Sequence, residues 1–197
     1  MKQSLVQRAT RALLLLLLCG VLSACEGLDT TSAAGAIAQP TLATSSPYVL
    51  PEPPTVSASF INRVLLAYHS PAAGLGQTML DDGQHFRIDP VYALAWFLHE
   101  DGMGTTGWGA LNRSLGNTRC SQGYSCRGGY RAYPSWAAGF WDWFHLLRVL
   151  YIDQWHLSTV AAIVPVYAPS SDHNDVAGYI SAIEQSVDTW RAGRVLV

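Results

Sequence analysis

One predicted helix restricts the possible folds of this chain of 197 residues. It covers residues 90–100, where Asp89 provides an N-cap side chain and Pro90 suits the first helical position. The residues that follow are apolar on every side of the helix until His99 and Glu100. A helix without a polar face has to be buried all round, so we expect this one at the centre of the fold.

Other helices are predicted where apolar residues recur at helical spacing. They cover approximately residues 57–68, 135–151, 158–166 and 174–192. Glycines and a proline make residues 70–88 a predicted loop with at most a short helix near 75–82. Seven glycines in residues 104–134 predict a small, loop-rich lobe with a hairpin around residues 124–133. The expected fold is mostly α, with a helical lobe and a small glycine-rich lobe.

The first 24 residues show the features of a bacterial lipoprotein signal peptide in the expected order. Three basic residues precede an apolar stretch of about ten residues, which is too short to stay in a membrane as a spanning helix. The stretch ends in Leu22-Ser23-Ala24-Cys25, which resembles a lipobox. We predict cleavage before Cys25 and diacylation of Cys25, which gives an extracytoplasmic protein anchored to the cell membrane (the outer membrane or periplasm in a Gram-negative cell). An ordinary signal peptide cut near Ala24 is the alternative.

Residues 25–57 are predicted to be a disordered tether, because Pro, Ser, Thr and Ala dominate them. The remaining residues 58–197 are the right length for one folded domain. The 14 acidic residues of the sequence outnumber its 12 basic ones, three of which lie in the signal peptide. This balance argues against nucleic acid as a partner.

Cys120 and Cys126 are the only cysteines after Cys25. In an exported protein they are expected to form a disulfide that closes a small loop. A metal site is the alternative, but no histidine lies beside them at a zinc-like spacing. The zinc-protease motif that begins at His99 is also excluded, because Met103 takes the place of its second histidine. We therefore expect no metal and no cofactor.

Glu100 is the candidate catalytic residue. Burial, the negative end of the helix dipole and the neighbouring charge of Asp101 are each expected to raise its pKa. A carboxylic acid that stays protonated near neutral pH can protonate a glycosidic oxygen. The alternative is a glutamate that points into solvent at a frayed helix end.

Four segments, in order, resemble the glucosaminidase domain of bacterial peptidoglycan hydrolases, a lysozyme-like family that includes proteins described as mannosyl-glycoprotein endo-β-N-acetylglucosaminidase-like. They are Ile88–Ala95 with Glu100–Thr105, Asn112–Gly116, Tyr130–Ser135, and Tyr167–Pro169 with Asn174 and Tyr179. The resemblance covers approximately residues 58–192 and implies a lysozyme-like fold with a cleft between two lobes. It also implies that Glu100 is the general acid.

The sequence departs from the family pattern in two places. Asp101 stands where the family usually has a small hydroxyl residue. A second carboxylate often lies in the small lobe of the family, but this chain has no Asp or Glu between Gly102 and Tyr133. The attack on the anomeric carbon then falls to the 2-acetamido group of the substrate, or to water assisted by Asp101 or Asp172.

The resemblance implies an endo-β-N-acetylglucosaminidase that cleaves β-1,4 bonds of peptidoglycan. Tyr167 is the second candidate catalytic residue, unless it is a core tyrosine. The candidate substrate-binding residues are Trp108, Asn112, Asp101 and Tyr133, although Tyr133, like Arg131, can instead anchor the small lobe. Trp108 is favoured for sugar contact.

Two alternatives remain open at this point. The first is a lytic transglycosylase, and the second is a catalytically silent, glycan-binding envelope lipoprotein. The expected partners are peptidoglycan glycan strands and, through the anchor, a membrane. The domain is expected to be a monomer.

Overall fold

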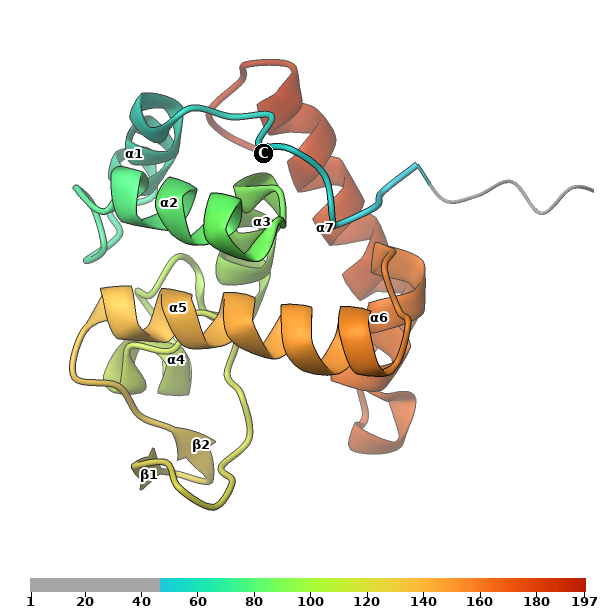
Figure 1. Cartoon of the computed structure of the whole chain (residues 1–197). Helices are drawn as coiled ribbons and strands as arrows, with labels where there is room; N and C mark the ends of the chain where they lie inside the picture. Colours follow the sequence, from blue (N-terminus) through green and yellow to red (C-terminus); the bar gives the residue numbers. More distant parts are fainter. Residues whose placement is uncertain (1–46) are drawn as a thin grey trace, which may run out of the picture. The chain divides into compact units, whose positions relative to one another are not determined.

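A computed structural model of the chain describes residues 47–197, which are mostly helical with one small two-stranded sheet, as predicted (Figure 1). The elements in order are α1 (Ala58–Ala67), α2 (Gly76–Phe86), α3 (Pro90–Asp101), α4 (Gly107–Asn112), β1 (Cys126–Arg127), β2 (Tyr130–Arg131), α5 (Trp136–Leu146), a π-helix (Leu147–Gln154), α6 (Val160–Tyr167), a 3-10 turn (Ser170–Asp172) and α7 (Val176–Arg191). Residues from Ala43 to Val197 form one compact unit. It contains the whole described core, so we expect it to fold alone.

Helix α3 is the buried centre of this unit, as its sequence predicted. The Asp89 side chain accepts a hydrogen bond from the Val91 N–H at 3.1 Å, and Pro90 occupies the first helical position. The side chains from Val91 to Phe97 have no exposed surface. Gly102 ends the helix at a φ of 59°, a left-handed conformation that glycine adopts without strain. The centre of the fold therefore leads directly to Glu100.

Helix α2 is longer than the short helix near residues 75–82 that was expected at most within the predicted loop of residues 70–88. Gly76 and Gly83 lie within the helix at places where the backbone of another segment comes very close. A Cβ on Gly76 would overlap the Ala58 carbonyl oxygen, and a Cβ on Gly83 would lie 2.8 Å from the Ile88 carbonyl oxygen. These glycines are required by close packing rather than by a turn.

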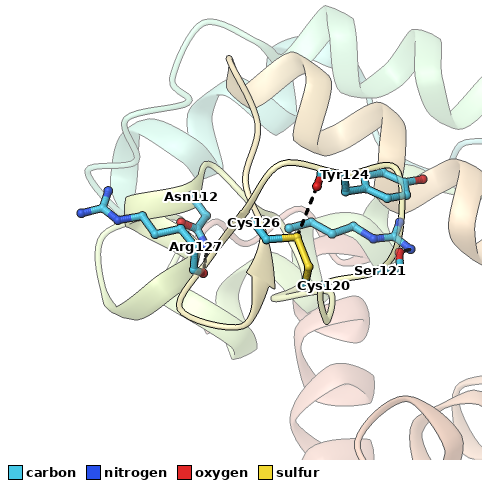
Figure 2. Close-up of a disulfide and its surroundings, with 7 residues drawn as sticks. Asn112, Cys120, Ser121, Tyr124, Cys126 and Arg127 are labelled. Atoms are coloured by element: carbon cyan, nitrogen blue, oxygen red, sulfur yellow. Dashed lines mark hydrogen bonds between the residues drawn. A yellow bond between two sulfur atoms is a disulfide. The ribbon is translucent and has the colours of Figure 1, made fainter.

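The small lobe, residues 104–134, contains the predicted hairpin and disulfide. Strands β1 and β2 pair antiparallel, with Cys126 opposite Arg131. Cys120 and Cys126 are bonded, with their Cα atoms 5.7 Å apart (Figure 2). The lobe also contains α4, which the glycine-rich sequence did not predict.

The second half of the chain follows the predicted helices closely. Ser135 caps α5, but the helix continues beyond the predicted end at Tyr151 as the π-helix. Thr159, rather than Ser158, caps α6, and Asp175 caps α7. The end of α7 lies beside the segment that precedes α1, where the Arg191 guanidinium forms an ion pair with Glu52 at 3.0 Å (Figure 1).

The segment before α1 belongs to the fold, which corrects the predicted domain boundary at residue 58. Leu50 is fully buried, its N–H donates to the Ser158 carbonyl oxygen at 2.8 Å, and its own carbonyl oxygen accepts from the Asp89 N–H at 3.0 Å. Val56 is also buried. The predicted signal peptide and lipidated Cys25 lie outside the described residues. Within residues 47–197, no helix has the length and apolar character needed to span a membrane.

Candidate active site

A pocket with a volume of about 520 Å³ opens at the C-terminal end of α3. One wall is formed by residues 116–121 together with Tyr130 and Arg131 of the small lobe. The opposite wall comes from the α5–π-helix segment, the end of α6 and residues 168–174. Glu100 is the residue that α3 contributes to this pocket, so the buried central helix delivers one carboxyl group to its surface.

The Glu100 carboxyl is held by hydrogen bonds on both oxygens. The Tyr179 hydroxyl, from α7, donates to Oε1 at 2.5 Å. The Asn117 side-chain amide donates to Oε2 and to the Glu100 carbonyl oxygen, each at 3.2 Å. The carboxyl is therefore fixed by one residue of α7 and one loop residue, which lie 79 and 17 positions from it in sequence.

Burial raises the pKa of Glu100 above its ordinary value, while the hydrogen bonds from Tyr179 and Asn117 act in the opposite direction. Burial was one of the causes expected from the sequence. The expected repulsion from Asp101 does not operate near neutral pH, because burial raises the pKa of Asp101 to about 8 and leaves that carboxyl largely protonated. The net effect on Glu100 favours a neutral carboxylic acid.

Asp101 does not line the pocket, which corrects its prediction as a substrate-binding residue. Its side chain is almost fully buried. Its Oδ1 accepts a hydrogen bond from the Gly104 N–H at 2.7 Å, and a Cβ on Gly109 would overlap its Oδ2. Asp101 therefore ties the end of α3 to the following turn and to α4.

Tyr167 lines the same pocket as Glu100. Its hydroxyl donates a hydrogen bond to the Gly116 carbonyl oxygen across the two walls. Burial raises the pKa of Tyr167 well above 10, so the phenol stays neutral. Because its proton is engaged by Gly116, the phenol can offer only an oxygen lone pair to a ligand in the pocket.

The structure does not place Trp108, Asn112 and Tyr133 at the pocket with Glu100, although the sequence suggested them as substrate contacts. Trp108 is 42% exposed, packs against Gly128, and lines a separate shallow hollow on α4. The buried Asn112 side chain donates to the Arg127 carbonyl oxygen at 3.0 Å (Figure 2).

Tyr133 serves instead as an anchor of the small lobe. Its hydroxyl donates to Asp142 Oδ2 at 2.5 Å, and the Arg131 guanidinium donates to the same oxygen at 2.8 Å. The alternative reading of Tyr133 and Arg131, as residues that hold the lobe, agrees with these contacts.

The sequence gave Asn117 and Arg119 no role at the pocket. Arg119 forms an ion pair with Asp172 at 2.7 Å, and both residues line the pocket from opposite walls. Among the described residues, Asp172 is the one carboxylate besides Glu100 on the pocket wall. Tyr179 had appeared only in a family motif and on the apolar side of the last helix. Neither pattern can reveal a contact with Glu100, which lies far away in sequence.

No group of three or more His, Cys, Asp or Glu side chains within residues 47–197 is arranged to hold a metal ion. The sequence matches no protein-family model and no curated protein.

Proposed function

We propose that this protein is a peptidoglycan hydrolase, an endo-β-N-acetylglucosaminidase in which Glu100 is the general acid. The observation that carries the proposal is the state of the Glu100 carboxyl. It lies on the wall of a pocket, partly buried, with a raised pKa and hydrogen bonds on both oxygens. The family resemblance of the sequence supplies the substrate class.

The reaction follows from the groups on the two walls. Glu100 gives its proton to the glycosidic oxygen while the bond from that oxygen to the anomeric carbon breaks. Positive charge then develops on the sugar ring. The neutral phenol of Tyr167 can stabilise this charge by turning an oxygen lone pair towards it. Water then attacks the anomeric carbon, either directly or after the 2-acetamido oxygen has closed an oxazolinium ring on that carbon. The proton that this water loses returns to the Glu100 carboxylate.

Asp172 is the protein carboxylate available to assist that water. It lines the pocket, whereas Asp101, the other residue suggested by the sequence, is buried away from it. The ion pair with Arg119 at 2.7 Å keeps Asp172 in position on the wall.

We also propose that Cys25 carries a lipid anchor, so that residues 26–46 connect the catalytic unit to a membrane next to the cell wall. The support is the order of charge, apolar run and lipobox in the sequence. Radiolabelled palmitate should be incorporated into the full chain and not into Cys25→Ala. Equal labelling of the two chains would disprove the anchor.

The activity is tested by digesting purified peptidoglycan with the unit from Ala43 to Val197. The products are reduced with borohydride, and their new ends are identified by mass spectrometry. We expect reduced N-acetylglucosamine ends from the wild type and none from Glu100→Gln. Glu184→Gln makes the same chemical change away from the pocket and should retain the activity.

Three other outcomes would contradict the proposal in different ways. Anhydro-muramic ends would identify a lytic transglycosylase. Binding to insoluble wall material without any new end would identify a silent glycan-binding protein. Equal activity in folded Glu100→Gln would remove Glu100 from the role of acid.

A further inference from the structure

We propose that Tyr179 and Asn117 are positioning residues, which hold the Glu100 carboxyl so that its transferable proton lies on Oε2, the oxygen nearer the pocket. This inference rests on the proposed function, since it assigns a role in the delivery of the acid's proton. It goes beyond that function because neither residue was a candidate for the catalytic machinery in the sequence.

The two oxygens of Glu100 have different surroundings. Tyr179, which contacts Oε1 at 2.5 Å, is only 5% exposed and does not line the pocket. Asn117, which contacts Oε2 at 3.2 Å, does line the pocket. Oε1 therefore lies on the side of the helical core, and Oε2 lies on the side from which a substrate arrives.

The hydroxyl proton of Tyr179 determines which oxygen of Glu100 can carry the acid proton. Burial and the neighbouring Glu100 raise the pKa of Tyr179 well above 10, so this phenol keeps its proton. Among the described residues, Oε1 is the acceptor that this O–H meets. A proton on Oε1 would point at the hydroxyl proton of Tyr179, because both would lie in the same short O–O contact. The acid proton therefore resides on Oε2.

Asn117 holds the other side of the same carboxyl. Its Nδ2 group uses one N–H for the Glu100 carbonyl oxygen and the second for Oε2. The carbonyl oxygen can only accept, and this fixes the orientation of the amide. The two bonds tie the side chain of Glu100 to its own backbone and leave Oε2 with room for its proton.

Both bonds become stronger as the proton leaves, because hydrogen bonds to a charged acceptor are about twice as strong as those to a neutral one. The donors are already in place, so stabilising the new carboxylate requires no reorganisation. They also limit the rise in the pKa of Glu100 that burial causes, since both lower it. Glu100 can then lose its proton to a glycosidic oxygen and later regain it.

The other titratable groups around this site are compatible with the assignment. They are Asp101 and His99 on α3, Tyr167 on α6, Tyr151 on the π-helix, Tyr130 and Arg131 on β2, and the Arg119–Asp172 pair on the pocket walls. The His99 ring lies 3.8 Å from the Tyr179 ring, and burial lowers the pKa of His99, so it is neutral near pH 7. Asp101, Tyr151 and Tyr167 are also largely neutral there. The charges on the pocket walls are those of Arg119, paired with Asp172, and of Arg131, paired with Asp142.

The first test measures the protonation of Glu100 without any substrate. The sequence has four glutamates, of which Glu52, Glu100 and Glu184 belong to the unit from Ala43 to Val197. Carbon-13 labelling of glutamate therefore gives three carboxyl signals in that unit, and Glu100→Gln identifies the one of interest. We expect Tyr179→Phe to move the Glu100 titration to higher pH, because it removes a bond that favours the carboxylate.

Tyr68→Phe is the matched control, since it removes a phenol hydroxyl that contacts the Val197 N–H at the far end of the chain. It should leave the titration of Glu100 where it is in the wild type. An unchanged or lowered Glu100 titration in folded Tyr179→Phe would overturn the inference.

The second test uses the hydrolysis of peptidoglycan fragments. In Tyr179→Phe we expect kcat to fall about 10- to 100-fold, as for loss of a hydrogen bond to a charged group, with KM nearly unchanged. The alkaline limb of the pH profile should move to higher pH, because Glu100 stays protonated for longer. Loss of activity by the same factor at every pH would mean that Tyr179 has only a structural role.

The two tests separate failure of this inference from failure of the proposed function. A wild-type unit that cleaves no glycan fails the proposed function, while the carbon-13 titration still decides how Glu100 is held. An active wild type with an unmoved titration in Tyr179→Phe fails the inference alone.

Discussion

The Tyr167 hydroxyl lies directly against Gly116, and it donates its proton to the carbonyl oxygen of that glycine. The contact joins the end of α6 to the first residue of the opposite pocket wall. A Cβ on Gly116 would overlap the Tyr167 hydroxyl and would lie 2.6 Å from Trp143 Cδ1. The phenol of Tyr167 can therefore occupy its position only because residue 116 has no side chain.

Gly116→Ala should displace the Tyr167 ring and lower both stability and activity. Overpacking of this kind costs about 1–3 kcal/mol in the free energy of unfolding, which urea titration can measure. Tyr167→Phe removes the first overlapping atom, so the double variant should be less destabilised than the sum of the single variants. Simple additivity would show that the two residues do not interact in this way.

The buried carboxyl of Asp101 should make stability fall as pH rises. Its pKa increases from an ordinary value of 3.8 to about 8 in the fold, so the folded state binds the proton more tightly than the unfolded state. The stability from this group is complete below about pH 4 and is lost as pH rises towards 8. Asp101→Asn resembles the protonated form and does not titrate, so the variant should lose less stability than the wild type between pH 5 and pH 8. Parallel urea curves at these two values would measure the difference, and an equal loss in both proteins would exclude Asp101 as the source.

Removal of Arg131 should destabilise the small lobe strongly. Arg131 and Asp142 are both buried and form an ion pair at 2.8 Å. Arg131→Met leaves the charge of Asp142 buried without its partner, which costs about 3–5 kcal/mol. Asp142→Leu combined with Arg131→Met should recover much of that loss in a urea titration. A double variant as unstable as Arg131→Met would contradict this account.

The ion pair between Arg119 and Asp172 should matter for substrate binding more than for stability. The Arg119 side chain is 76% exposed, and exposed pairs contribute about 0–1 kcal/mol. Arg119→Asp should therefore change the melting temperature little but raise KM for peptidoglycan fragments, because it places two acidic groups across the pocket. Exchange of the two residues, Arg119→Asp with Asp172→Arg, restores opposite charges and should lower KM again. A KM that is the same in all three proteins would place the pair outside the substrate path.

Local signals in the sequence were sufficient for most of the helical fold. Asp89-Pro90, Ser135 and Asp175 mark helix starts because capping depends on neighbouring residues only. Helix α2 was expected only as a short helix near residues 75–82, and α4 was not expected, because Gly76, Gly83 and Gly109 resemble turn residues in the sequence. These glycines are present because another part of the chain approaches too closely to leave room for a Cβ. Such contacts between distant residues leave no local pattern in the sequence.

The candidate site was predictable only where it coincides with the end of a helix. Glu100 was proposed because the apolar pattern of α3 ends there, and Tyr167 because its segment resembles a motif of the glucosaminidase family. The partners that hold Glu100 come from distant segments, and neither Tyr179 nor Asn117 differs in sequence from an ordinary core or loop residue. Leu50 was assigned to the tether for the same reason, since its burial depends on Ser158 and Asp89.

The π-helix after α5 determines which side chains of this segment face the pocket. Leu150 and Tyr151 of the π-helix line the pocket together with Leu146, the last residue of α5. A turn of π-helix contains one more residue than the α-helical turn it replaces. Deleting one residue from this stretch would let it return to α-helical winding, and different side chains of the stretch would then face the pocket. The outline of the pocket therefore depends on the number of residues in this helix as well as on their identity.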